Sequence, residues 1–159
     1  EYKPMKQTYN EIKKYAYNGD TNCCTVIATS IAFEQPFKEV QKYFFSLGRK
    51  RNRGFRIYNY MDLICKKYNY DFEAITLHDK YRVRKIFGLG LTPNNVADYL
   101  DLSTYLIGTS NHIFTLKNGI VEDWTKNRRH QVETIIKVTP LKKVKDLNIS
   151  KPKYDFSEY

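Results

Sequence analysis

Residues 112–123 read His-Ile-Phe-Thr-Leu-Lys-Asn-Gly-Ile-Val-Glu-Asp and decide the fold, because they specify a β-hairpin. At the centre of this stretch, Asn118-Gly119 is the strongest two-residue turn signal, since both residue types accept the positive φ angles of a type I′ turn. A turn at this position pairs Lys117 with Ile120 and sets the register of the two strands. The hairpin therefore anchors an antiparallel sheet in the second half of the chain.

One side of the hairpin combines apolar and ionisable side chains, because successive side chains point to opposite faces of a strand. The residues expected on this side are His112, Phe114, Leu116, Val121, Asp123 and Thr125. His112 and Asp123 become diagonal neighbours, roughly 7–8 Å apart at Cα, which an imidazole and a carboxylate can span. The apolar members predict that this side packs on the core, with the His–Asp pair at the open end of the sheet.

Helical spacing and capping signals surround the hairpin with further elements. Helices are expected at 8–16, 24–33, 37–47, 57–68 and 94–102, and further strands at 71–77, 103–108 and 132–138. Helices first and antiparallel strands after them are typical of the α+β class. We expect one domain over residues 1–138, followed by a basic tail, 139–159, which has too few apolar residues to be ordered throughout.

The composition allows one folded core and a strongly basic surface. The chain has 159 residues, 42% of them hydrophobic, and a formal charge of +10. Wholesale disorder is therefore excluded. No apolar run approaches the ~20 residues that a membrane-spanning helix needs, so no membrane association is expected. The charge is regional, because residues 48–85 contain eleven basic and four acidic residues, whereas 86–138 contain five of each.

The basic excess is densest in two groups that predict a partner of opposite charge. The first is Arg49, Lys50, Arg51, Arg53 and Arg56, between and just beyond two glycines, and the second occupies residues 80–85. A solvated basic loop of this kind can bind nucleic acid or an acidic protein surface. The alternative is a loop that only keeps the protein in solution.

Three cysteines, two of them adjacent, do not form a disulfide framework. The paired spacing of structural zinc sites is absent, and neither a metal nor another cofactor is expected. Thiols suggest action in the cytoplasm. A cysteine at the start of the helix at 24–33 would be activated, because a helix N-terminus stabilises thiolate over thiol. Cys24 shares a face with Ala28 and Ile31, which suits packing on the His-bearing sheet; Cys23 remains the alternative nucleophile.

These residues resemble the papain-like cysteine peptidase superfamily. The likeness rests on Cys24 with Ala28 in the first long helix, a Gly-Arg-Lys loop at 48–50, and the later pair His112 and Asp123. It is closest to bacteriocin-processing (double-glycine) peptidases and small phage-encoded cysteine-peptidase-like proteins, and it spans roughly residues 18–138. Two departures stand out: Cys23 occupies the place of the motif's Asp, and Asn18 occupies the place of the oxyanion-hole Gln.

The resemblance implies a papain-like fold and a cysteine-dependent hydrolase or acyl-transfer enzyme. Cys24 would be the nucleophile, His112 the base, Asp123 its orienting carboxylate, and Asn18 an oxyanion donor. The substrate implied is a protein or peptide of a host or virus, and the location is the cytoplasm of an infected bacterium if a phage encodes the chain. The rival expectation is a catalytically inactive papain-like scaffold that binds a host protein or nucleic acid through its basic loop. Neither the substrate nor the oligomeric state follows from the residues.

Overall fold

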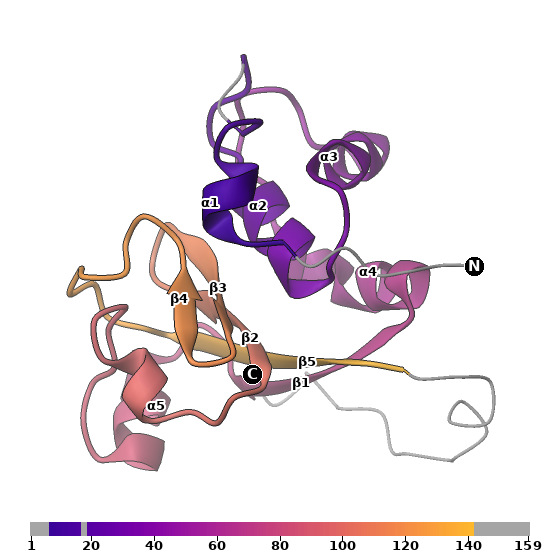
Figure 1. Cartoon of the computed structure of the whole chain (residues 1–159). Helices are drawn as coiled ribbons and strands as arrows, with labels where there is room; N and C mark the ends of the chain where they lie inside the picture. The colour runs from indigo at the N-terminus through magenta and orange to yellow at the C-terminus, as the bar shows by residue number, and fades with distance from the viewer. Residues whose placement is uncertain (1–6, 17–18, 142–159) are drawn as a thin grey trace.

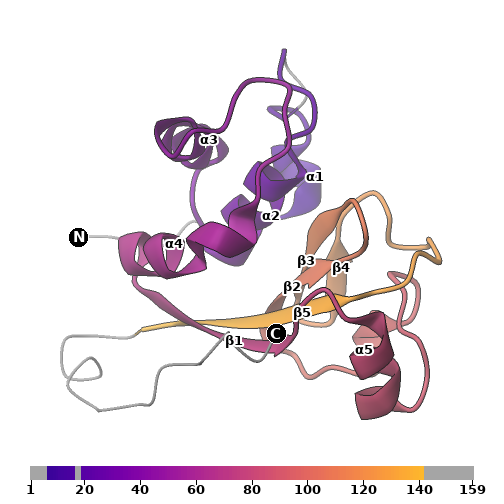
Figure 2. The same cartoon turned by 180° about the vertical axis from the view of Figure 1, so that it is seen from behind.

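The computed structural model describes residues 7–16 and 19–141, which form one five-stranded sheet with helices on both sides (Figure 1; Figure 2). The helices are α1 (Tyr9–Ile12), α2 (Cys24–Ala32), α3 (Phe37–Ser46), α4 (Met61–Tyr68) and α5 (Lys80–Phe87), with two 3-10 helices, η1 (Ile57–Tyr60) and η2 (Val96–Asp98). The strands are β1 (Tyr70–Thr76), β2 (Thr104–Gly108), β3 (Ile113–Lys117), β4 (Ile120–Glu122) and β5 (Thr134–Pro140). The expected α+β class is confirmed.

The sheet is antiparallel throughout and has the order β1-β5-β2-β3-β4. Its hairpin has the predicted register, with Lys117 opposite Ile120 and Leu116 opposite Val121. The turn residue Asn118 has a φ of 53°, as the type I′ geometry requires. The last strand passes the expected domain end at 138 and continues to Pro140; the rest of the predicted basic tail, from 142, lies outside the described residues.

Two hydrophobic cores lie on opposite faces of the sheet. The larger core joins helices α1–α4 to one face and includes Ile31, Phe44 and Ile113. The smaller core lies on the α5 side and includes Val83 and Phe114. In Figure 1, α1–α4 lie above the sheet and α5 lies below it. Because both faces are covered, β3 is buried on both sides.

This two-sided burial corrects one expectation about the hairpin. The side with Phe114 and Leu116 does not face the cysteine-bearing helix but packs in the smaller core. The opposite side meets α2, where the Thr115 hydroxyl donates a 2.7 Å hydrogen bond to the Ala28 carbonyl. Alternation separates the two faces of a strand, but it cannot say which helix covers which face when both are apolar.

One predicted helix in the middle of the chain is absent, and one helix that is present was not predicted. Residues 94–102 form only the short η2 and turns, because the Asn95 side chain accepts a hydrogen bond from the Thr92 N–H and favours a local turn. Conversely, α5 was not predicted. Its Asp79 N-cap accepts from the Arg82 N–H, and Gly88 ends it with a φ of 80°. Only Val83 of α5 is buried, so the segment lacks the apolar periodicity that marks a helix in sequence.

Within the described ranges, no helix combines the length and the apolar character needed to cross a membrane.

Candidate active site

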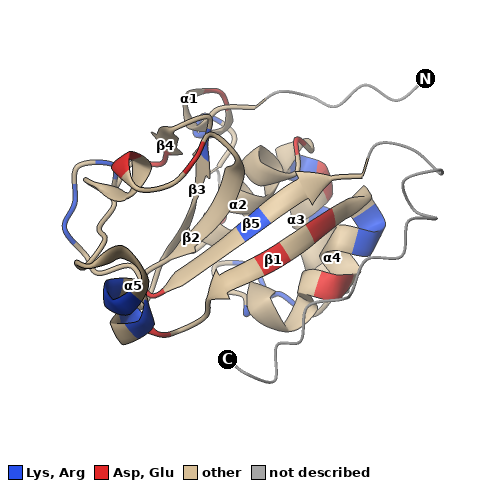
Figure 3. Ribbon diagram, turned by 90° about the horizontal axis from the view of Figure 1, so that it is seen from below, with Lys and Arg blue, Asp and Glu red and all other residues tan. Residues whose placement is uncertain are grey.

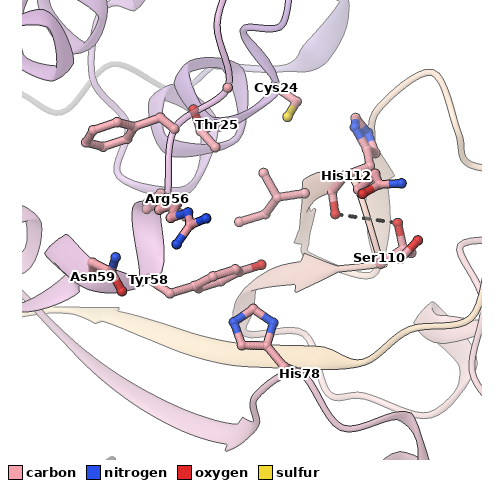
Figure 4. Close-up of a pocket in the computed structure, with 14 residues that line it drawn as sticks. Cys24, Thr25, Arg56, Tyr58, Asn59, His78, Ser110 and His112 are labelled. Atoms are coloured by element: carbon pink, nitrogen blue, oxygen red, sulfur yellow. Dashed lines mark hydrogen bonds between the residues drawn. The ribbon is translucent and has the colours of Figure 1, made fainter. Parts of the chain in front are cut away.

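The first turn of α2 distinguishes the two adjacent cysteines. Cys23 is the N-cap residue and belongs to the larger core, with 1% of its surface exposed. Cys24 is the first helical residue and lines a cavity (Figure 4). The partial positive charge of a helix N-terminus therefore lies beside a thiol that a ligand can reach. The predicted preference for Cys24 agrees with this placement, although the reason differs, because the face of β3 that bears Phe114 does not contact α2.

His112 lies in the turn that leads into β3, and Asp123 follows the end of β4. The His112 Nε2 and an Asp123 carboxylate oxygen are 2.7 Å apart, so the diagonal pairing derived from the hairpin is present. Thr125 fixes the carboxylate, because its hydroxyl and its backbone N–H both donate to the same oxygen. Since Asp123 occupies Nε2, the other ring nitrogen, Nδ1, is left for Cys24.

The environment of His112 favours the imidazolium. Burial alone lowers its pKa, but hydrogen bonds to the Asp123 carboxylate and to the Cys24 sulfur, together with the charges on both groups, raise the pKa to about 9. The side chain is 20% exposed, so these charges act in a medium that screens them less than water does. His112 is therefore held as a positive group between Cys24 and Asp123.

Aromatic rings flank the imidazole and limit its rotation. The Trp124 ring lies 5.5 Å from the His112 ring and the Phe114 ring 6.3 Å, measured between centroids. Continued strand alternation would place Trp124, next to Asp123 in the sequence, on the opposite face of the hairpin. β4 ends at Glu122, so strand alternation no longer applies, and the half-exposed indole turns towards His112.

The cavity beside Cys24 has a volume of about 390 Å³. Cys24 and His112 form one wall, and Arg56, which caps η1, and Tyr58, within η1, form the facing wall (Figure 4). Burial raises the pKa of the Tyr58 phenol despite a hydrogen bond from Thr134, so the phenol stays protonated and can donate. The His78 side chain is 56% exposed and also lines this cavity.

Arg49 does not belong to the basic surface as predicted. Its guanidinium forms a bidentate pair with Asp20, at 2.8 and 2.9 Å, and its side chain is fully buried. The Asn52 N–H and the Gln41 amide also donate to this carboxylate. Burial alone would raise the pKa of Asp20, but these hydrogen bonds, led by that from Arg49, lower it to about 2. The pair ties the basic loop to the segment that precedes Cys23, which positions the start of α2.

The remaining cations of the loop are exposed. They are Lys50, Arg51, Arg53 and Arg56. The second basic group, residues 80–85, lies on α5, across the sheet from this loop, where Figure 3 shows Lys and Arg concentrated. The two predicted groups therefore form separate surfaces, and only the loop borders the cavity, through Arg56.

Asn18, the predicted oxyanion donor, lies outside the described residues. Sequence reasoning missed Tyr58, Thr125 and the structural partner Asp20. The hairpin pattern places Thr125 on the same side as Asp123, so its contact with the carboxylate could have been predicted. No local pattern marks Tyr58, because Tyr is frequent in this chain and the segment reads as an ordinary amphipathic helix.

No protein-family model, curated protein or solved structure matches this chain.

Proposed function

We propose that this chain is a cysteine-dependent hydrolase or acyl-transfer enzyme of papain-like architecture, with Cys24, His112 and Asp123 as its catalytic triad. The observation that carries the proposal is the position of His112, which hydrogen-bonds Asp123 through Nε2 and also hydrogen-bonds Cys24. The three residues come from different parts of the chain: Cys24 and His112 line one cavity, and Asp123 is hydrogen-bonded to His112 outside that lining. A histidine with a purely structural role would not need a thiol at a helix N-terminus beside it, so the presence of Cys24 favours a catalytic role.

The first half of the reaction transfers an acyl group to sulfur. In the proposed resting state the Cys24 proton already lies on His112, and the thiolate attacks the carbonyl carbon of an amide or thioester. The Cys24 backbone N–H, at the first position of α2, stabilises the oxyanion. His112 then donates its proton to the leaving group as the carbonyl re-forms, which leaves an acyl-cysteine.

The second half releases the acyl group. His112 removes a proton from water, or from another acceptor, and the resulting nucleophile attacks the acyl-cysteine. The C–S bond breaks, and Cys24 leaves as the thiolate. Throughout, Asp123 keeps the Nε2 proton engaged and therefore holds the tautomer in which Nδ1 faces the sulfur.

Thiol alkylation tests the proposal without knowledge of the substrate. We expect iodoacetamide at pH 6–7 to modify Cys24 at least about tenfold faster than a free cysteine peptide, because thiolate is the reactive form. Peptide mapping identifies the modified residue. His112→Ala should remove the acceleration, whereas Cys23→Ser should retain it. Urea unfolding of each variant verifies that it is folded.

Two outcomes would overturn the proposal. One is a Cys24 that reacts no faster than the free peptide in the folded protein. The other is a rapid reaction that His112→Ala leaves unchanged, since the histidine would then play no part in activation. A thioester substrate supplies an independent check, because the acyl-cysteine adds the mass of the acyl group to the Cys24 peptide.

The inactive scaffold is the second candidate, and the exposed cations Lys50, Arg51 and Arg53 favour it. It predicts binding of nucleic acid or an acidic protein that weakens steeply with salt, because each phosphate contact releases counterions. Replacing these three residues with Gln should abolish such binding. Binding that is absent, or insensitive to salt, contradicts this candidate.

A further inference from the structure

The lining of the cavity beside Cys24 has an unbalanced charge. Its fourteen residues include Arg56, His78 and His112 and contain neither Asp nor Glu. Two carboxylates lie just outside the lining: Asp123, 2.7 Å from the His112 Nε2, and Glu133, 3.8 Å from the His78 Nδ1. Among the described residues, Arg56 is therefore the cation of the lining without a carboxylate partner, and its charge favours an anionic ligand.

Arg56 is the cation best placed to bind such a ligand. Figure 4 shows its guanidinium directed into the cavity, across from Cys24. In the described part of the chain, this guanidinium has no carboxylate or other hydrogen-bond partner, in contrast to Arg49 a few residues earlier. Its fork of donors matches the two oxygens of a carboxylate.

Tyr58 supplies a second donor on the same wall. The Thr134 hydroxyl accepts from the His78 N–H, at 3.0 Å, and is also hydrogen-bonded to the Tyr58 hydroxyl. A protonated phenol is a hydrogen-bond donor that a carboxylate oxygen can accept. Gly108 makes room for this hydroxyl, because a Cβ at that position would lie 2.4 Å from it.

A second cavity extends this surface away from Cys24. It has a volume of about 380 Å³, shares Arg56 and Asn59 with the first cavity, adds the exposed Lys50 and Arg53, and also lacks carboxylates. An acidic segment that reaches the first cavity along this side meets cations over its whole path.

We infer that the cavity beside Cys24 is a specificity site for a carboxylate of the substrate, held by Arg56 and the Tyr58 hydroxyl. The inference rests on the proposed function in that the acyl group attacked by Cys24 would belong to an acidic peptide. The carboxylate is either an Asp or Glu side chain or a free C-terminus, and both present the same two oxygens.

A pair of reagents with nearly equal size tests the charge preference. Iodoacetate and iodoacetamide both alkylate thiolate with loss of iodide, but only iodoacetate is an anion. The ratio of their rates at Cys24 cancels the thiolate fraction, which affects both. The His112 imidazolium also favours iodoacetate, but it is retained in variants of Arg56. We expect Arg56→Gln to lower the ratio about tenfold, the effect of losing one charged hydrogen bond.

Lys38→Gln is the matched control, because it removes one exposed cation that lines neither cavity. We expect it to leave the ratio unchanged within about twofold. The inference is overturned if Arg56→Gln leaves the ratio intact, or if both variants lower it equally, since net charge alone would then explain the preference.

Ligand binding separates this inference from the proposed chemistry. The Cys24→Ala protein is titrated with N-acetyl-glutamate α-amide, N-acetyl-glutamine and N-acetyl-glutamine α-amide, and amide chemical shifts are followed by NMR. The first probe carries only a side-chain carboxylate, the second only a terminal one, and the third none. Binding of either acid that Arg56→Gln weakens at least about tenfold supports the site and identifies the source of the carboxylate.

Equal binding of all three probes, or binding of none, overturns the carboxylate site. If Cys24 of the unsubstituted protein is unreactive while an acid binds through Arg56, the proposed hydrolase is wrong and the anion site remains. If Cys24 is reactive but no probe is preferred, the hydrolase remains and the anion site is wrong.

Discussion

Two carboxylate–cation pairs of nearly equal length have opposite settings in this molecule. Asp20 and Arg49 are 2.8 Å apart, with side chains 2% and 0% exposed, and their hydrogen bonds join two loops. His112 and Asp123 are 2.7 Å apart, but His112 is 20% exposed and lines the cavity with Cys24. The length of an ion pair therefore says little about its role. Access from solvent and the presence of a third reactive partner distinguish the pair that holds the fold from the pair suited to chemistry.

The largest expected effect on stability is at the buried Asp20–Arg49 pair. Asp20→Asn leaves Arg49 buried without a counter-charge, so we expect the free energy of unfolding to fall by about 3–5 kcal/mol. Urea denaturation measures this loss. Asp98→Asn, at an exposed position, is the control and should change stability by less than about 0.5 kcal/mol. Equal effects of the two substitutions would show that the Asp20–Arg49 pair does not hold the loops.

The two pairs should respond to opposite extremes of pH. The folded pKa of Asp20 is about 2, below its usual 3.8, so its stabilisation is complete above pH 3.8 and is lost as pH falls towards 2. The folded pKa of His112 is about 9, above its usual 6.5, so its stabilisation is complete below pH 6.5 and is lost as pH rises through 9. The alkaline loss amounts to up to about 3 kcal/mol.

Stability measured from pH 2 to 10 checks both signs. Asp123→Asn should flatten the alkaline slope and leave the acid slope, whereas Asp20→Asn should do the reverse. If both substitutions changed the same slope, the two pairs would not contribute to stability independently.

Asp123→Asn should have a smaller effect on stability than Asp20→Asn but a larger direct effect on the thiol. We expect the free energy of unfolding to fall by about 1–3 kcal/mol. The loss is smaller because His112 is partly exposed to water and the Asn side chain can still form some of the hydrogen bonds of Asp123. The alkylation rate of Cys24 at pH 6–7 should fall about tenfold, since the imidazolium loses its counter-charge. Stopped-flow alkylation measures the rate. A rate equal to that of the unsubstituted protein would remove Asp123 from the proposed triad.

The smallest effect is expected at the exposed cations of the loop. Lys50→Gln with Arg53→Gln should change the free energy of unfolding by less than about 0.5 kcal/mol, because both side chains are solvated. Arg49→Gln, in the same loop, should cost several kcal/mol by leaving Asp20 unpaired. Thermal denaturation of the two proteins makes the comparison, and similar losses would mean that burial does not separate Arg49 from its neighbours.

The contrast between the two pairs also shows what could be predicted from sequence. The register of the hairpin follows from Asn118-Gly119 alone, and it places His112 near Asp123 because the geometry of a two-residue turn is local. The start of α2 at Cys24 follows from helical periodicity. These signals act over a few residues, so the main parts of the candidate site were accessible before the fold was known.

The buried pair could not be predicted in the same way. Arg49 stands in a run of cations and looks like its neighbours, and its partner Asp20 is far from it in sequence. The covering of β3 by α2 on one face and by the α5 side on the other is likewise a tertiary choice. Tyr58 enters the cavity because η1 turns it there, a rotation that the helical pattern of 57–68 does not specify.

Gly108 lies against Tyr58, one of the residues that line the cavity. One added methyl group at this position would press on the Tyr58 hydroxyl and on the Thr134 side chain, which a Cβ would approach to 2.9 Å. The place of the Tyr58 ring, and with it the space left for a ligand, therefore depends on the absence of a single carbon atom at residue 108.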